Sequence, residues 1–188
     1  MTRIIGGVLG SLRLKGPAKA TRPTSDRVKE SIFSILESQG AIQDARVLDL
    51  FAGTGALGLE AASRGARSVT LVERDPAAAK VCEENLTQVV DGLFKSGFDC
   101  DVRLVRSDAK SYLKKNQQVD LVFVDPPYEF AHNEILNLLQ NLNLSDTGIV
   151  VLERPGKEKA SAHGAYLLQQ EKSYGDTKVV FLVRDDAQ

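Results

Sequence analysis

The sequence predicts an α/β fold of the Rossmann-like kind, with a mostly parallel sheet of seven strands. The first observation behind this prediction is the alternation, from Ala45 onward, of short apolar runs with segments whose apolar residues recur at helical spacing. The second is a glycine-rich loop at residues 53–58, placed between a strand and a helix. The third is Gly175-Asp176, which separates two strand-like runs and predicts an antiparallel hairpin at the end of the sheet.

The N-terminal segment differs from the rest of the chain. Residues 3–17 carry four glycines among alternating apolar and basic residues, which favours a short β-ribbon over a helix. A helix capped by Thr24 or Ser25 should follow and end at Gly40. Its apolar positions recur at helical spacing, which predicts that Arg27 and Lys29 point away from the buried stripe.

The expected strands of the sheet follow in order, with helices between them. We expect strands at residues 46–51, 68–73, 102–105, 119–125, 148–152, 166–174 and 177–183. Helices should begin near Ala56, Pro76, Asp108 and Glu129, and the last of these should end near Leu142. We therefore divide the chain into an N-terminal unit, residues 1–40, and a main domain, residues 41–188.

Composition narrows the class of protein. The chain has 188 residues, of which 43% are hydrophobic and 26% charged, enough for one domain with its own core. No apolar run approaches the roughly 20 residues that cross a bilayer, and the N-terminus does not resemble a signal peptide, so we expect a cytoplasmic protein without a membrane partner. Cys82 and Cys100 have no Cys or His at ligand spacing, so we expect no metal site. We expect a monomer.

The charge is unevenly distributed. The net charge is −1, yet residues 1–29 hold seven basic side chains and one acid, Asp26. A basic segment on a mildly acidic body indicates a polyanionic partner held at one place. A solvated N-terminal tail explains the charge equally well.

The glycine loop indicates a cofactor that contains adenosine. Gly53 and Gly55 allow a tight turn and let a ligand approach main-chain N–H groups. Glu73 ends the second strand and stands where a ribose-binding acid is expected. This pattern alone also fits a nicotinamide dinucleotide, and hence an oxidoreductase.

Asp49 favours a cationic cofactor over a dinucleotide. A carboxylate just before the loop would repel a pyrophosphate but attract the ammonium and sulfonium of S-adenosyl-L-methionine. Asp49, Glu73 and Asp108 follow three parallel strands, whose carboxyl ends line one crevice. Asp108-Ala109 could supply an acceptor for the adenine amino group. Any one of these acids could instead be a helix N-cap.

A second motif, Asp125-Pro126-Pro127-Tyr128, follows an apolar strand. The two prolines fix φ and remove backbone donors, which makes the segment rigid. An exocyclic amine on a base is a poor nucleophile, and the Asp125 side chain with the Pro126 carbonyl could hold it as acceptors. Tyr128 offers a face on which the base could stack. These four residues are the predicted catalytic set.

The order of these motifs resembles that of the class I S-adenosylmethionine-dependent amino-methyltransferases. Flanking segments narrow the likeness to the bacterial RsmD-type enzymes, which methylate the N2 amino group of guanine 966 in 16S ribosomal RNA. The resemblance covers residues 3 to 183 and is carried by residues 3–7, 21–30, 49–60 and 174–177. It implies an RNA methyltransferase that acts on 16S ribosomal RNA or the assembling small subunit.

The resemblance also implies residue roles. The cofactor would be bound by Asp49, Phe51, Gly53, Gly55, Glu73, Arg74, Asp108, Ala109 and Asp125. RNA would be bound by Arg3, Arg13, Lys15, Arg22, Thr24, Arg27, Tyr174 and Thr177. An adenine-N6 methyltransferase uses the same Asp-Pro-Pro-Tyr chemistry and stays an alternative, as does an inactive RNA-binding protein with this fold.

Overall fold

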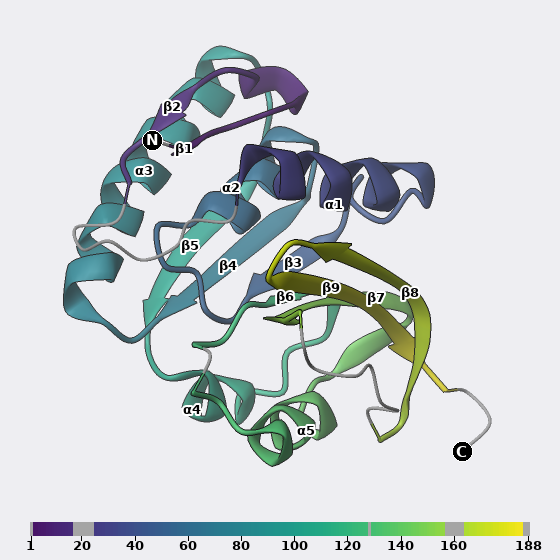
Figure 1. The fold of residues 1–188 in the computed structure, drawn as a ribbon. Helices are drawn as coiled ribbons and strands as arrows, with labels where there is room; N and C mark the ends of the chain where they lie inside the picture. Colours follow the sequence, from purple (N-terminus) through teal and green to yellow (C-terminus); the bar gives the residue numbers. More distant parts are fainter. Residues whose placement is uncertain (1, 17–24, 128, 157–163, 186–188) are drawn as a thin grey trace.

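A seven-stranded sheet forms the centre of the structure, a computed structural model that describes residues 2–16, 25–127, 129–156 and 164–185 (Figure 1). The strand order is β5-β4-β3-β6-β7-β9-β8, and β9 alone runs opposite to the direction of the other six strands. The strands are β3 (Arg46–Asp49), β4 (Ser68–Glu73), β5 (Asp101–Arg106), β6 (Val119–Val124), β7 (Leu144–Pro155), β8 (Tyr166–Tyr174) and β9 (Thr177–Arg184). The predicted fold class, including the closing hairpin, is confirmed.

Five α-helices pack on the two faces of this sheet within the described residues. They are α1 (Asp26–Ser38), α2 (Ala56–Ser63), α3 (Pro76–Lys95), α4 (Ala109–Leu113) and α5 (His132–Gln140). Helices α1, α2 and α3 cover one face, and α4 and α5 cover the other (Figure 1). A ribbon of β1 (Thr2–Arg3) and β2 (Arg13–Leu14) lies outside the sheet, beside α3, with a short 3-10 turn, η1 (Gly7–Leu9), between its strands.

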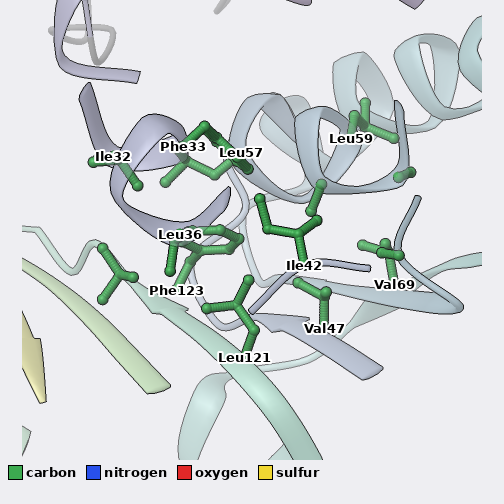
Figure 2. Packing of buried hydrophobic residues seen from close by; sticks show 14 of the residues in the cluster. Ile32, Phe33, Leu36, Ile42, Val47, Leu57, Leu59, Val69, Leu121 and Phe123 are labelled. Carbon is green, nitrogen blue, oxygen red and sulfur yellow. The ribbon is translucent and has the colours of Figure 1, made fainter. Parts of the chain in front are cut away.

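The two faces have separate hydrophobic cores because side chains alternate along each strand. On β6, Leu121 and Phe123 point to the core beneath α1 and α2, whereas Val122 and Val124 point to the core above α4 and α5. Figure 2 shows the first core, in which the rings of Phe33 and Phe123 pack with their centroids 5.6 Å apart. Strand β6 is therefore buried on both faces.

Several predicted boundaries shift in the structure. Strand β3 ends at Asp49, not at residue 51, because the chain turns there into the glycine loop. Helix α5 begins at His132, three residues after the predicted start, since the chain first turns with a bond from Phe130 N–H to the Pro127 carbonyl. Helix α1 is capped by the Ser25 hydroxyl, which accepts from Val28 N–H.

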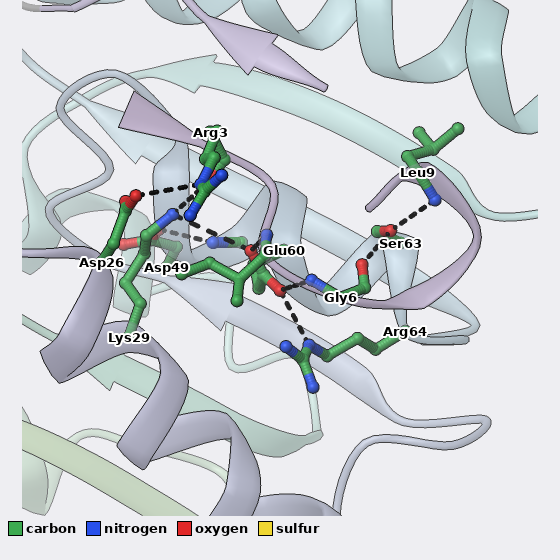
Figure 3. Close-up of polar contacts among 11 residues, drawn as sticks. Arg3, Gly6, Leu9, Asp26, Lys29, Asp49, Glu60, Ser63 and Arg64 are labelled. Carbon is green, nitrogen blue, oxygen red and sulfur yellow. Dashed lines mark hydrogen bonds and ion pairs between the residues drawn. The ribbon is translucent and has the colours of Figure 1, made fainter. Parts of the chain in front are cut away.

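The prediction that Lys29 is exposed is wrong. Its side chain is fully buried, and its ammonium group donates to the Arg3 carbonyl and lies 3.8 Å from the carboxylate of Glu60 (Figure 3). Glu60 also accepts hydrogen bonds from Ile5 N–H at 2.7 Å and Gly6 N–H at 2.8 Å. These contacts tie the ribbon and α1 to α2, and a cation at a helical position can be buried because a partner on another element neutralises it.

The N-terminal unit shares its core with the sheet. Ile4 and Leu14 of the ribbon and Phe33 of α1 belong to the same cluster as Phe123 of β6. The division at residue 40 therefore does not separate two hydrophobic cores. Separate roles for residues 1–40 and 41–188 stay a prediction.

Strand β8 forms one edge of the sheet. Its pairing with β9 slips between Leu168 and Gln170, where one residue of β8 has no counterpart. Leu167 and Leu168 are about half exposed on this edge.

In the described part of the chain, no helix combines the length and apolar character needed to cross a membrane.

Candidate functional site

The glycine loop joins β3 to α2 in a tight turn. Gly53 and Gly55 have φ angles of +55° and +83°, in the left-handed region where a side chain is strained. A Cβ added at Gly53 would meet only the Phe51 carbonyl oxygen, 4.0 Å away, so the space above this residue is open to a ligand. Gly58 serves packing instead, because a Cβ there would lie 2.3 Å from a methyl group of Leu71.

Asp49 lies beneath this loop. Its carboxylate accepts a hydrogen bond from Gly58 N–H at 3.1 Å, and the residue is 2% exposed. Burial raises the pKa of Asp49 to about 7; the Gly58 bond opposes the rise, while the negative charges of Asp125 and Glu73 add to it. A cation beside this carboxyl would stabilise its ionised form.

Glu73, at the end of β4, is held by the main chain on both carboxylate oxygens. One oxygen accepts from Gly53 N–H at 2.8 Å and the other from Asp75 N–H at 2.7 Å. Each carboxylate oxygen has a second lone pair, so these bonds leave acceptor capacity for ribose hydroxyls. The acid and the glycine loop thus form one connected unit.

An open pocket of about 350 Å³ lies next to Glu73, between the ends of β4 and β5. Arg74, Pro76 and Ala79 line it from the β4 side, and Arg106, Ser107 and Asp108 from the β5 side. Asp108 is the N-cap of α4, with its carboxylate accepting from Ser111 N–H at 2.9 Å. Hydrogen bonding to the side chain and then to the main chain of Ser111 lowers the pKa of Asp108. Asp108 therefore has a structural function, and an adenine contact by Asp108 or its buried neighbour Ala109 stays a prediction.

Asp125 is the first residue after β6, the strand that pairs with β3. Asp49 and Phe123 are partners in this pairing, and Leu50 N–H donates to the Phe123 carbonyl at 3.0 Å. Although Asp125 keeps some exposure, burial of its carboxyl raises its pKa to about 6. The predicted cofactor acid and the predicted catalytic acid therefore come from the ends of adjacent strands.

The segment after Asp125 is braced against the glycine loop. Pro126 is buried and Pro127 exposed, and the ring of Phe130 packs edge-on against Phe51 at 5.2 Å between centroids. Arg154, buried on β7, donates to the Phe130 carbonyl at 3.1 Å. Tyr128 lies outside the described residues.

The comparisons with known proteins agree with this architecture. Residues 2–183 match the family model described as "Conserved hypothetical protein 95". The chain is 36% identical to "Ribosomal RNA small subunit methyltransferase D" of Escherichia coli K12, with 93% of this chain and 92% of that protein covered. A relative of the same name from Haemophilus influenzae is 32% identical, with 92% and 89% covered. The solved structure of Escherichia coli yhhF superposes with a TM-score of 0.81 at 36% identity, covering 100% of this chain and 99% of that one.

This chain belongs to the RsmD family of methyltransferases. The membership confirms the resemblance inferred from residues 3–7, 21–30, 49–60 and 174–177. It also decides between the two cofactor-binding classes left open by the glycine loop, in favour of a methyltransferase and against an oxidoreductase. The role of each site residue stays a prediction.

The basic residues predicted to bind RNA in this RsmD-family chain lie in different surroundings. Arg3 pairs with Asp26 at 3.1 Å, and Lys15 pairs with Glu84 at 2.8 Å, both at the surface. Arg13 and Arg27 are exposed. Arg22 and Thr24 lie outside the described residues. Despite these ion pairs, the side chains of Arg3 and Lys15 stay more than half exposed, so their charges are accessible, as a phosphate contact requires.

The two predicted RNA contacts of the closing hairpin are engaged within the protein. Tyr174 is only partly exposed, and its hydroxyl donates to the Ser31 hydroxyl of α1. Thr177 is 6% exposed. In this arrangement the hairpin braces α1, and a direct RNA contact by either side chain stays a prediction.

Sequence reasoning missed three polar residues that organise the site. Glu60 on α2 binds the ribbon, Asn85 on α3 binds both the ribbon and the glycine loop, and Arg154 binds the turn after Pro127. Glu60 occupies a helical position flanked by Leu59, Ala61 and Ala62, which are all fully buried. That apolar setting was the one sequence signal that could have marked it as a buried acid.

Proposed function

We propose that this methyltransferase transfers a methyl group from S-adenosyl-L-methionine to the N2 amino group of a guanine, guanine 966, in 16S ribosomal RNA of the small subunit. The observation that carries the proposal is the pairing of β3 with β6, which sets the glycine loop and its acids beside the Asp125-Pro126-Pro127 segment. The names of the relatives, which refer to the small-subunit ribosomal RNA, support the choice of RNA.

The residues present fit this cofactor by the chemistry of their donor set. Asp49 offers a buried carboxyl that a neighbouring cation would ionise, and Glu73 offers acceptors for two hydroxyls. The open space above Gly53 admits a ligand that no Cβ blocks. A pyrophosphate would meet the negative charge of Asp49 and Glu73 instead.

The cofactor supplies, when bound, an electrophilic methyl group on a positively charged sulfur. The protein must then hold an amino nitrogen in line with that carbon and sulfur, because alignment contributes more than acid–base assistance to such a displacement. A guanine within a helix must leave its stack to reach the site. Asp125 accepts a hydrogen bond from the amino group of this guanine, and the rigid prolines keep the Asp125 carboxylate in place.

Asp125 also receives the proton that methylation releases. A methylated amino nitrogen is cationic and strongly acidic, so a carboxylate with a pKa of about 6 takes or relays its proton readily. At neutral pH this carboxyl is mostly ionised before the reaction, as an acceptor must be.

The test is transfer of a labelled methyl group to small ribosomal subunits from cells that lack this protein, followed by analysis of the digested nucleosides. We expect label in N2-methylguanosine, and no label with Asp125→Ala. Label in N6-methyladenosine would overturn the choice of guanine but keep the site. Label in neither nucleoside, with S-adenosyl-L-methionine bound, would overturn the enzymatic proposal.

A further inference from the structure

Asn85 joins the N-terminal ribbon to the glycine loop. This residue of α3 is fully buried, and its side-chain oxygen accepts from Lys15 N–H at 2.7 Å. Its side-chain nitrogen donates to the Lys15 carbonyl at 3.0 Å and to the Thr54 carbonyl at 2.9 Å. One side chain thus binds the main chain just after β2 and the main chain between the two left-handed glycines.

The three bonds require an amide. The oxygen of Asn85 is used as an acceptor and both hydrogens of its nitrogen are used as donors, which matches the full donor set of this side chain. Aspartate could accept from Lys15 N–H but could not donate to either carbonyl. A buried carbonyl that loses its donor costs free energy, so the chain would move to satisfy it.

The loop end of this link lies at the predicted cofactor site. Thr54 stands between Gly53, whose N–H binds Glu73, and Gly55, which α3 supports from below. A Cβ at Gly55 would lie 3.0 Å from the sulfur of Cys82, one helical turn before Asn85. Holding the Thr54 carbonyl therefore holds the loop in the shape that leaves the space above Gly53 open.

The ribbon end of the link lies among the residues predicted to bind RNA. Lys15 is exposed apart from its pair with Glu84, and Arg13 lies two residues before it. The ribbon turn also packs against α3, since a Cβ at Gly92 would lie 2.9 Å from Leu9. Asn85 thus joins the ribbon, which carries predicted RNA-binding residues, to the glycine loop, the predicted cofactor site.

We propose that Asn85 is a positioning residue that couples cofactor binding to the docking of the N-terminal ribbon. This rests on the proposed function, since it takes the glycine loop as the cofactor site. Cofactor binding then stabilises the ribbon through Thr54 and Asn85, and by thermodynamic reciprocity a docked ribbon strengthens cofactor binding by the same factor.

The first test uses the unmodified protein and S-adenosylhomocysteine, the demethylated product of the cofactor. We expect the ligand to slow hydrogen exchange of the amide at Lys15, with β9 as an internal control whose exchange does not change. Exchange at Lys15 that stays the same while the ligand saturates the protein would overturn the proposal.

The second test compares Asn85→Asp and Asn85→Ala with Thr87→Ala, a control on the same helix. The hydroxyl of Thr87 donates to the Glu83 carbonyl within α3, and the residue is exposed to solvent. We expect calorimetry to show roughly tenfold weaker binding of S-adenosylhomocysteine for both Asn85 variants, because both lose the buried hydrogen bond to the Thr54 carbonyl of the glycine loop. The control should bind as the wild type does.

A purely structural role would give a different result. If Asn85 only stabilises the fold, the variants will melt at lower temperature, yet the folded protein will bind S-adenosylhomocysteine with unchanged affinity, and this overturns the proposal. If Asn85→Ala does not fold, Asn85→Asp and the exchange experiment decide the question. Failure of the wild type to bind the ligand would instead overturn the proposed function.

Discussion

The acids beside the glycine loop and the acid after β6 lie at the ends of neighbouring strands, yet the chain holds them differently. Asp49 and Glu73 accept hydrogen bonds from main-chain N–H groups of the loop and of the next turn. Asp125 is followed by two prolines, which have no N–H to donate, and burial raises its pKa. The acids of the predicted cofactor half, Asp49 and Glu73, are therefore preorganised by the backbone, whereas the acid of the predicted acceptor half, Asp125, is followed by residues that offer it no main-chain donor.

Removal of the acid in the acceptor half should have the largest effect. Asp125→Ala should lower turnover by on the order of 10³-fold, because it removes the acceptor that holds the amino group and takes its proton. Affinity for S-adenosylhomocysteine, measured by calorimetry, should stay within tenfold of the wild type, since Asp49 and Glu73 are untouched. A large loss of affinity would show that the two halves are not separate.

The buried charges that anchor the ribbon should matter next, for stability. Lys29→Met removes the donor to the Arg3 carbonyl and one of the two cations beside the buried carboxylate of Glu60, which keeps its ion pair with Arg64 at 2.8 Å. The loss of this buried, charged donor should lower the free energy of unfolding by about 2 kcal/mol. Urea denaturation measures the change. Arg67→Ala removes an exposed ion pair with Asp44 and should shift the midpoint little, and equal effects of the two variants would contradict our account of the ribbon.

The pH dependence of cofactor binding should be the next effect in size. With a pKa of about 7, Asp49 is increasingly protonated below neutral pH, so a cationic cofactor must release that proton to bind. Affinity for S-adenosyl-L-methionine should therefore fall, by up to about tenfold for each pH unit below 7, and level off above it. Asp49→Asn should remove this dependence.

The same group gives the opposite trend for the unliganded fold. The pKa of Asp49 is higher in the folded protein than its ordinary value of 3.8, so the folded state binds more protons than the unfolded state between about pH 4 and 7. The contribution of Asp49 to stability should fall as the pH rises through this range. Thermal melting of wild type and Asp49→Asn across the same range would separate this contribution from those of other groups.

The smallest effect concerns RNA. Replacing Arg13 and Arg27, which are exposed, by Ala should lower the salt dependence of RNA binding by roughly 0.7 to 0.9 in slope for each phosphate that the variant no longer neutralises. Methyl transfer at saturating RNA should change little. Lys114→Ala is the matched control, at the C-terminal end of α4, a helix that lies away from the ribbon in Figure 1. An equal change in slope for this control would show that the RNA lies elsewhere.

Much of the fold could be predicted because its signals are local. The bounds of β4 and β8 agree with the prediction, since apolar or alternating runs are bounded there by loop residues. The start of α3 at Pro76 follows from Asp75, which caps the helix by accepting from Ala78 N–H at 2.8 Å. The end of β6 was predicted to within one residue, because the prolines after Asp125 cannot continue the strand, whereas the catalytic role of Asp125 stays a prediction.

The rest depends on contacts between distant parts of the chain. Lys29 follows the pattern of an exposed residue, and only the three-dimensional neighbourhood of Glu60 makes its burial possible. Asn85 is an ordinary polar residue in a long helix until the ribbon brings Lys15 against it. Asp108 differs from both, because its hydrogen bond makes it the N-cap that its place before a helix allowed, while the ligand contact that the same place suggests stays a prediction. Periodicity reports which face is buried, but not which polar groups meet there.

The slipped pairing of β8 affects how copies of this protein meet in a crowded solution. An open sheet edge is a template on which a strand from another molecule can add. Here the extra residue between Leu168 and Gln170 breaks the ladder, and charged Glu171 and Lys172 follow it. A foreign strand would lose its alignment within a few residues, so this irregularity protects the exposed leucines beside it from seeding aggregates.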